Sequence, residues 1–238
     1  TSLAFMAQQA LAVQTAANPE TIVAGLRARY RTAIHAQASA PGQGAALGVG
    51  SSANAGGPGA EDADHWLVFV DGQFDPALSA IGALPGGAQL GSLADALKGT
   101  PEAVEAAFGD ASEGETPAAL NAAFATDGGW IRLGRRVAVE QPIHLVFIGA
   151  AGPDHHLRNL IVAEAGAQAT IVEHYPAGAG GTTLTTAVTR ILGAQDSHIV
   201  HLKLQEEAPD AIHLATIAAV QARGAVFASH SLSFGARL

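Results

Sequence analysis

Three side chains capable of acid–base chemistry stand together at Glu173, His174 and Tyr175. A carboxylate, an imidazole and a phenol are groups from which general acid–base sites are built. The surrounding residues, "EAGAQATIVEHY", read as a β-strand, in which neighbouring side chains point to opposite faces. We therefore predict that Glu173 and His174 share neither a proton nor a metal. His174 is instead expected to be a partly buried, hydrogen-bonded residue of the fold.

Four histidines recur at nearly regular intervals and could form a metal-binding ladder on stacked strands. They are His144, His174, His201 and His230. If the apolar residues of "VHLKL" face the core, His201 points outward together with Lys203. In "SHSLSF", by the same reasoning, His230 shares the inward face of Leu232 and Phe234. His201 and His230 then point in opposite directions, so a continuous ladder is not expected.

The other candidates for chemistry carry weaker signals. His155 and His156, preceded by Asp154, have no third ligand at a metal-site spacing, and we interpret them as a polar turn. The acidic pair Glu206 and Glu207 lies in the proline-containing turn "QEEAPD". The motifs GxSxG, GxxxxGK[ST] and HExxH are absent from the sequence. We predict no catalytic, cofactor-binding or metal-binding residue.

Composition excludes several classes of function. The sequence has no cysteine, which excludes disulfides, a thiolate nucleophile and cysteine-based metal sites within these 238 residues. The net charge of −9 is concentrated in residues 61–115, which hold eleven acids and one lysine, and no basic stripe compensates elsewhere. Binding to nucleic acid is therefore not expected. No apolar run approaches the roughly 20 residues of a membrane span, and the Ala-rich start lacks the basic residues of a secretory signal. We expect a cytoplasmic protein without a membrane contact.

The first 64 residues divide into a helical segment and a linker. Residues 1–40 are predicted to be helical, with Asn18 as a cap, Pro19 in the first turn and a helix that runs to about His35. Residues 41–64 are rich in Gly and Ala and have no hydrophobic periodicity, which predicts a linker.

Residues 65–129 are predicted to form a short hairpin and helices that lead into the core. The alternation in "HWLVFVDGQF" breaks at Asp71-Gly72, which is typical of a tight hairpin turn. "TPEAVEAAF" and "TPAALNAAF" each offer a Thr cap followed by Pro at the first helical position. We expect each helix to rest one apolar stripe on the core. The stripes are Val104, Ala107 and Phe108, and Leu120, Ala123 and Phe124.

Residues 130–238 read as strands without intervening helices, which indicates an all-β array. "GAQ" occurs at 166–168 and 193–195, and "GA" at 224–225, at steps of 27 and 31 residues. Such spacing suits stacked coils of a parallel β-helix with Val, Ile, Leu and Ala inside. An antiparallel meander or sandwich is the alternative.

The strand array resembles a known family. "WIRLGRRVAVEQPIHLVF", "RNLIVAEAGAQATIVEHY" and "HLKLQEEAPDAIHLATIAAVQARGAVFASHSLSFGARL" are similar to the SufB/SufD family of the SUF iron–sulfur cluster assembly system, and more to its SufD type than to its SufB type. The resemblance covers roughly residues 66–238. It implies a right-handed parallel β-helix (a solenoid) preceded by an α-helical N-terminal region.

The resemblance also implies a function and partners. It suggests a non-catalytic scaffold subunit in a complex with a SufB-like paralogue and a SufC-like ABC-type ATPase. Family members continue with more coils and a helical segment, and the Cys and His residues tied to cluster assembly lie mainly there. The resemblance thus leads us to expect that residues 130–238 are truncated relative to the family's full set of coils. No cofactor is expected on this chain alone, and an iron–sulfur cluster is expected only within the complex. The alternatives are a β-helix carbohydrate-active enzyme, which needs paired carboxylates, and a homo-oligomeric structural solenoid.

Overall fold

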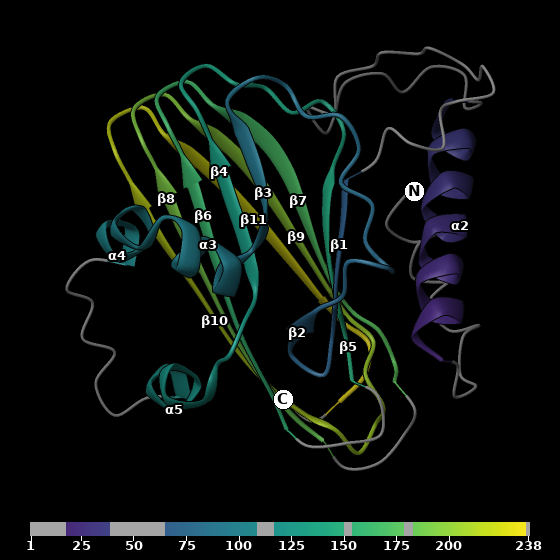
Figure 1. Cartoon of the computed structure of the whole chain (residues 1–238). Coiled ribbons are helices and arrows are strands. Elements are labelled where there is room, and N and C mark those ends of the chain that lie inside the picture. Colours follow the sequence, from purple (N-terminus) through teal and green to yellow (C-terminus); the bar gives the residue numbers. More distant parts are fainter. Residues whose placement is uncertain (1–17, 39–64, 109–116, 150–153, 179–182, 237–238) are drawn as a thin grey trace.

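The computed structural model describes residues 18–38, 65–108, 117–149, 154–178 and 183–236. Its strands wind into stacked coils whose sides are two β-sheets, and helices lie against both outer sides (Figure 1). Residues 1–17 and the predicted linker 41–64 lie outside the described residues. In the part that is described, no helix is both long and apolar enough to cross a bilayer.

Helix α2 (Pro19–Ala38) begins where the sequence predicts. The side-chain oxygen of Asn18 accepts a hydrogen bond from the Thr21 amide at 2.9 Å, which satisfies one of the free donors of the first turn. Glu20 stands in that turn, where the helix dipole favours a negative charge. The helix ends three residues beyond the predicted His35.

A hairpin follows, as predicted. Strands β1 (His65–Val70) and β2 (Gln73–Phe74) pair antiparallel around Asp71 and Gly72, whose φ angles are 50° and 78°. Positive φ at both central residues defines the turn whose twist matches that of paired strands, and Gly adopts it at little cost.

The strands from residue 129 onward form a parallel β-helix. Sheet A has the order β11-β9-β7-β5-β1-β2, and sheet B the order β10-β8-β6-β4-β3. The bounds are β3 (Ala88–Ser92), β4 (Gly129–Leu133), β5 (Ile143–Ile148), β6 (His155–Ala163), β7 (Gln168–Tyr175), β8 (Leu184–Gly193), β9 (His198–Gln205), β10 (Ile212–Gln221) and β11 (Val226–Ser233). Only the β1–β2 and β3–β4 pairs among these strands are antiparallel. The predicted solenoid is therefore confirmed, and the meander or sandwich alternative is wrong.

Each coil takes 28 or 30 residues. Arg158 pairs with Val188, and Val188 with Thr216. The turns between sheet B and sheet A stack as well, with positive φ at Arg136, Gly166, Asp196 and Gly224. The amide of each of the first three donates to a carbonyl of the next turn. The "GAQ" repeat does not follow this register. Gly166 aligns with Asp196, which lies three residues after Gly193, the first residue of the second "GAQ". The spacing of the repeat is nevertheless close to the observed length of a coil.

The core fills the interior between the sheets, which we call the lumen. The coils that come first in the chain are lined by large apolar side chains, including Leu67, Phe69, Leu145, Ile161 and Ile171. Two further apolar clusters lie outside the lumen. Ile22, Val23 and Leu26 of α2 pack on sheet A, and Leu93 and Val104 belong to the cluster on sheet B.

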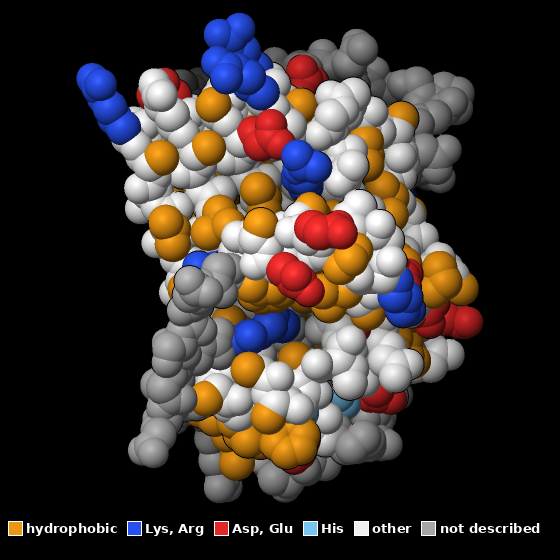
Figure 2. Space-filling view, turned by 60° about the vertical axis from the view of Figure 1, so that its left-hand side comes forward, with side chains coloured by type: hydrophobic (Ala, Val, Ile, Leu, Met, Phe, Trp, Pro, Cys, Tyr) orange, Lys and Arg blue, Asp and Glu red, His pale blue; other side chains and the backbone are white. Residues whose placement is uncertain are grey.

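Three short helices cover the outer side of sheet B: α3 (Leu93–Gly99), α4 (Pro101–Phe108) and α5 (Pro117–Phe124). The two predicted helices are present, and Val104 and Ala107 are buried as expected. The stripe predicted for α5 is wrong. Leu120 and Phe124 are exposed on this side of the molecule, where Figure 2 shows hydrophobic side chains at the surface. The buried residues of α5 are Ala118 and Asn121, whose amide donates to the Leu157 and Thr186 carbonyls.

Candidate functional site

Glu173 and Tyr175 come together in the lumen. Both belong to β7 and are 1% exposed, and the Tyr175 hydroxyl donates to Glu173 Oε2 at 2.9 Å. His174 points to the opposite side of the sheet, as predicted for strand neighbours. The alternation of neighbouring side chains concerns only the adjacent residues Glu173 and His174. Residues two apart on a strand share a face, and this spacing could have indicated the contact between Glu173 and Tyr175.

Three more side chains converge on the same carboxylate. The Thr189 hydroxyl donates to Oε1, Asn159 Nδ2 donates to it at 3.3 Å, and His201 Nε2 lies 3.2 Å away. We call Glu173, Tyr175, Thr189, Asn159 and His201 the Glu173 cluster. Its members come from strands β6 to β9, so the winding of the chain assembles it.

The electrostatics of the Glu173 cluster fix the protonation states of its carboxylate and its phenol. Burial alone would raise the pKa of Glu173, but attraction to His201 and the hydrogen bonds it accepts lower this pKa to about 2. Burial and the Glu173 carboxylate raise the pKa of Tyr175 well above its usual 10. Glu173 therefore stays ionised and Tyr175 stays protonated near neutral pH. The carboxylate is fully engaged by its neighbours.

Along sheet A, the side chains that face the lumen at paired positions of successive strands change from apolar to charged. Leu67 pairs with Leu145, Leu145 with Glu173, and Glu173 with Lys203. Lys203 is 6% exposed, and its ammonium lies 5.3 Å from the centre of the Tyr175 ring. Burial lowers the pKa of Lys203, against the opposing influence of Glu173 and Glu207.

The orientation predicted for strand β9 is therefore wrong. His201 is fully buried in the lumen and Lys203 lies beside it, whereas Leu202 faces the other way. Apolar residues occupy the outer face of this strand, so alternation alone does not tell which face is inside. His230 is also placed opposite to prediction. It is exposed on the outer side of β11, and the expected pointing of His201 and His230 in opposite directions nevertheless holds.

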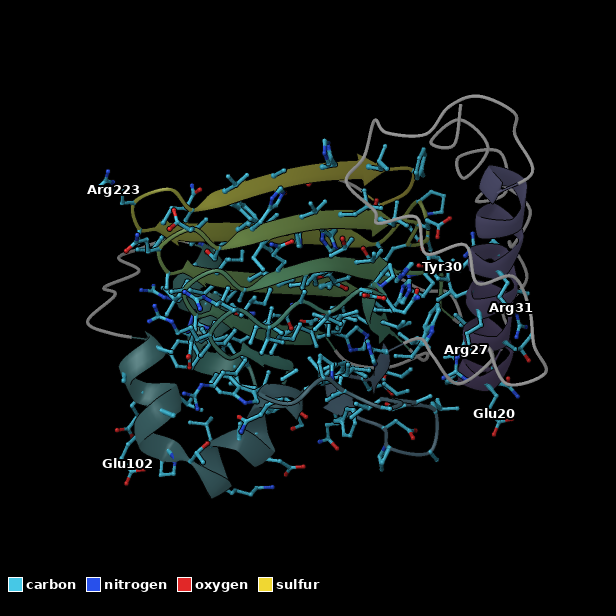
Figure 3. The ribbon with its side chains drawn as sticks, turned by 90° about the horizontal axis from the view of Figure 1, so that it is seen from above. Glu20, Arg27, Tyr30, Arg31, Glu102 and Arg223 are labelled. Atoms are coloured by element: carbon cyan, nitrogen blue, oxygen red, sulfur yellow. The ribbon has the colours of Figure 1, made fainter. Side chains whose placement is uncertain are left out.

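His144 and His174 form a second group, the outer histidine pair. Val146, the residue paired with His174, lies on the outer face of sheet A under α2. His144 Nδ1 lies 2.9 Å from His174 Nε2, so one imidazole donates to the other. The Trp66 ring stacks on His144 at 3.9 Å between centroids. Tyr30 meets His144 edge-on at 4.4 Å, and Figure 3 shows Tyr30 on the side of α2 that faces the coils.

Both imidazoles of the outer histidine pair are held neutral. Burial lowers the pKa of His174 to about 3, and Arg29 contributes in the same direction. Burial lowers the pKa of His144 well below 6.5, assisted by His174, His65 and Arg27. The predicted hydrogen bond of His174 is thus confirmed, and the side chain is more completely buried than the partial burial that the sequence predicts. Two of the four periodic histidines pair directly, but His201 and His230 do not extend them into a ladder.

A third group lies where strands of sheet B begin. The Thr185 hydroxyl donates to Glu207, Gln205 Nε2 donates to it at 3.0 Å, and His213 Nδ1 lies 2.7 Å from it. We call these four residues the Glu207 cluster. Burial would raise the pKa of Glu207, but His213 and the hydroxyl and amide donors lower it. Glu206 instead binds Arg29 of α2 outside the lumen. The two adjacent carboxylates therefore do not form the facing pair that glycoside hydrolysis needs.

His155 and His156 are the first residues of β6, and the predicted polar turn is wrong there. His155 is buried beside Thr185, and His156 Nδ1 lies 2.8 Å from the Thr186 hydroxyl. Across the described ranges, no three His, Asp or Glu side chains are grouped so that they could hold a metal ion. Iron–sulfur clusters are held chiefly by cysteine thiolates, and the sequence has none. The residues present do not fit such a cluster.

Comparison with known proteins matches most of the chain. Residues 146–238 match the SUF system FeS cluster assembly, SufBD core domain, and residues 62–145 match the SufBD protein N-terminal region. The chain is 28% identical over 186 residues to an iron–sulfur cluster assembly SufBD family protein of Synechocystis, which covers 72% of this chain and 41% of that protein. It is 33% identical over 176 residues to the iron–sulfur cluster assembly protein SufD of Escherichia coli, which covers 71% of this chain and 39% of that protein. The chain thus spans about two fifths of the length of these curated relatives.

Proposed function

Because the chain belongs to the SufB/SufD family, we propose that it is a SufD-like, non-catalytic scaffold subunit of a SufBCD-type complex. Family membership supports a role in iron–sulfur cluster assembly. The proposed partners are a SufB-like paralogue and a SufC-like ABC-type ATPase, in the cytoplasm. Nucleic acid and membrane are not among the proposed partners.

The observation that carries the scaffold role is the state of the polar residues. The buried carboxylate of Glu173 and the partly buried carboxylate of Glu207 are each engaged by several neighbours, and their pKa values are lowered. The two carboxylates connect adjacent coils, and neither is free to act as a nucleophile or a base. A frame of this kind would fix the geometry of surfaces that bind partners, while the cluster itself is the cargo.

The donor atoms of the chain support a division of labour. Carboxylates favour hard cations over the soft, sulfide-bridged core of a cluster, and cysteine is absent. We therefore propose that this chain alone holds no cluster. Assembly would require a SufB-like partner, or an interface between that partner and this chain.

Anaerobic reconstitution with iron and sulfide tests the proposal. The chain alone, the chain with a SufB-like partner and ATPase, and the partner with ATPase but without the chain are compared. We expect no cluster on the chain alone, and a higher yield of cluster in the complex than in the partner without it. Stoichiometric iron and sulfide with a charge-transfer band in the chain alone would contradict the proposal. So would an equal yield with and without the chain.

A further inference from the structure

We propose that Glu206 and Glu207, adjacent in the loop between β9 and β10, couple the position of helix α2 outside the solenoid to the Glu207 cluster in the lumen. Such coupling between the position of α2 and the Glu207 cluster would be a property of the fold, separate from the proposed function. It holds whether or not the protein takes part in cluster assembly.

Outside the solenoid, Glu206 is held by helix α2. Its two carboxylate oxygens lie 3.0 and 3.3 Å from Nη1 and Nη2 of Arg29. The side chains of Arg29 and Glu206 are 20% and 12% exposed, so water screens this bidentate pair only partly. The pair is the polar counterpart of the apolar contact that Ile22, Val23 and Leu26 make with sheet A.

Inside the solenoid, Glu207 is held by one side chain from β8, one from β10 and one from the last residue of β9. It accepts hydrogen bonds from Thr185 and Gln205, and it lies 2.7 Å from His213 Nδ1. The His213 ring meets the Tyr175 ring edge-on at 4.7 Å between centroids. Tyr175 in turn donates to Glu173. The Glu207 cluster is thus in contact with the Glu173 cluster.

The backbone between the two carboxylates has little freedom. The Glu206 amide donates to the Tyr175 carbonyl at 2.8 Å, which anchors the start of the loop to β7. Gly235 packs so closely on this segment that a Cβ there would lie 1.9 Å from the Glu207 carbonyl oxygen. A displacement of Glu206 by the helix is therefore shared by Glu207, because a single peptide unit joins them and the peptide units on either side of it are held in place. A molecule that lifts α2 would loosen the Glu207 cluster, and a change in the lumen would weaken the hold on α2.

The test uses the full chain with ¹⁵N-labelled histidine, together with hydrogen exchange of the loop amides. Arg29→Met and Glu206→Gln each remove the ion pair, from the helix side and from the loop side. We expect both variants to shift the ring nitrogen signals of His213 and to speed amide exchange in residues 206–212 by about tenfold. Arg27→Met is the matched control on the same helix, because Arg27 instead donates to the Leu78 carbonyl and lies over Trp66.

The double variant Arg29→Met/Glu206→Gln decides whether the effect passes through the ion pair. Coupling through Glu206 predicts that the double variant shifts His213 no further than either single variant. Three results would overturn the proposal: unchanged His213 signals in the single variants, additive shifts in the double variant, or an equal response to Arg27→Met. The last would mean that any loosening of α2 reaches the lumen without the Glu206–Glu207 connection.

Discussion

The outer histidine pair makes the stability of the fold depend on pH below about 6.5. In the unfolded chain, His144 and His174 take up protons near the ordinary pKa of 6.5, whereas in the fold the pKa of His174 is lowered to about 3 and that of His144 is lowered well below 6.5. Between these values the unfolded state binds more protons than the folded state. The free energy of unfolding is therefore greatest above pH 6.5 and falls as the pH falls toward the folded pKa.

The size of the effect follows from the two groups. Each histidine that stays neutral only in the fold costs about 1.4 kcal/mol per pH unit below its unfolded pKa. Between pH 6.5 and 5.0 the pair removes roughly 3 kcal/mol from a total that is typically about 5–15 kcal/mol, because the full slope is reached only about one unit below the unfolded pKa. This window lies above the range in which Glu173 and Glu207 titrate, because the pKa values of both are lowered from 4.5.

Urea unfolding at several pH values from 7.5 to 5.0 measures this dependence. His174→Gln is expected to cost about 1–3 kcal/mol at pH 7.5, because a buried hydrogen bond is lost. Its free energy of unfolding should fall less steeply with pH, by about 1.4 kcal/mol per unit. His230→Gln is the control, because His230 is exposed. The buried His155, whose pKa is also lowered by burial, contributes equally to all three proteins and cancels from the comparison. An unchanged pH slope in His174→Gln would refute the reasoning.

Three further changes test other parts of the fold by urea or thermal unfolding. Glu173→Ala should lower the free energy of unfolding by about 3–5 kcal/mol, because its buried partners are left without their hydrogen-bond acceptor. Glu164→Gln, at a half-exposed ion pair, should lower it by less than about 1 kcal/mol. Equal losses would contradict the importance of the Glu173 cluster. Asp127→Ala should cost about 3 kcal/mol, since this carboxylate accepts hydrogen bonds from Ser92 and from three backbone amides; a loss below about 1 kcal/mol would show that water replaces it. Gly166→Val should cost about 1–2 kcal/mol at its positive φ, whereas Asp196→Gly at the equivalent turn position should be neutral or stabilising; the reverse order would rule out backbone strain as the cause.

The sequence predicts the elements and the period of the solenoid better than it predicts which side chains face inward. Pro19, Asp71-Gly72 and the Thr-Pro pairs are local signals, and each element that they predict is present. The sequence predicts the wrong orientation for strand β9, because Val200, Leu202 and Leu204 are apolar although they face outward. The outer face of a solenoid sheet can be covered too, so hydrophobic alternation gives the faces but not their direction.

The Glu173 cluster could have been predicted only in part. The contact of Glu173 with Tyr175 follows from their spacing on one strand. The contacts with His201 and Thr189 need the register of neighbouring coils, which "GAQ" misplaces by three residues. The pairing of Asn121 with Thr186 has no local signal at all, since it depends on how α5 lies across sheet B. Contacts between distant segments are fixed by winding and packing, and the local pattern does not encode them.

The order in which strands pair has a consequence for how the protein is made. Strands β7, β9 and β11 each pair with a strand that precedes them in the chain by one coil: β5, β7 and β9. The other end of sheet A is already closed by the β1–β2 hairpin, so the first strands have partners early. At about 5–20 residues per second, a ribosome delivers a coil in roughly 1.5–6 seconds, which is long compared with the pairing of strands. Each new coil therefore meets a finished template, and the solenoid can grow during translation in one direction, without waiting for residues still to be synthesised.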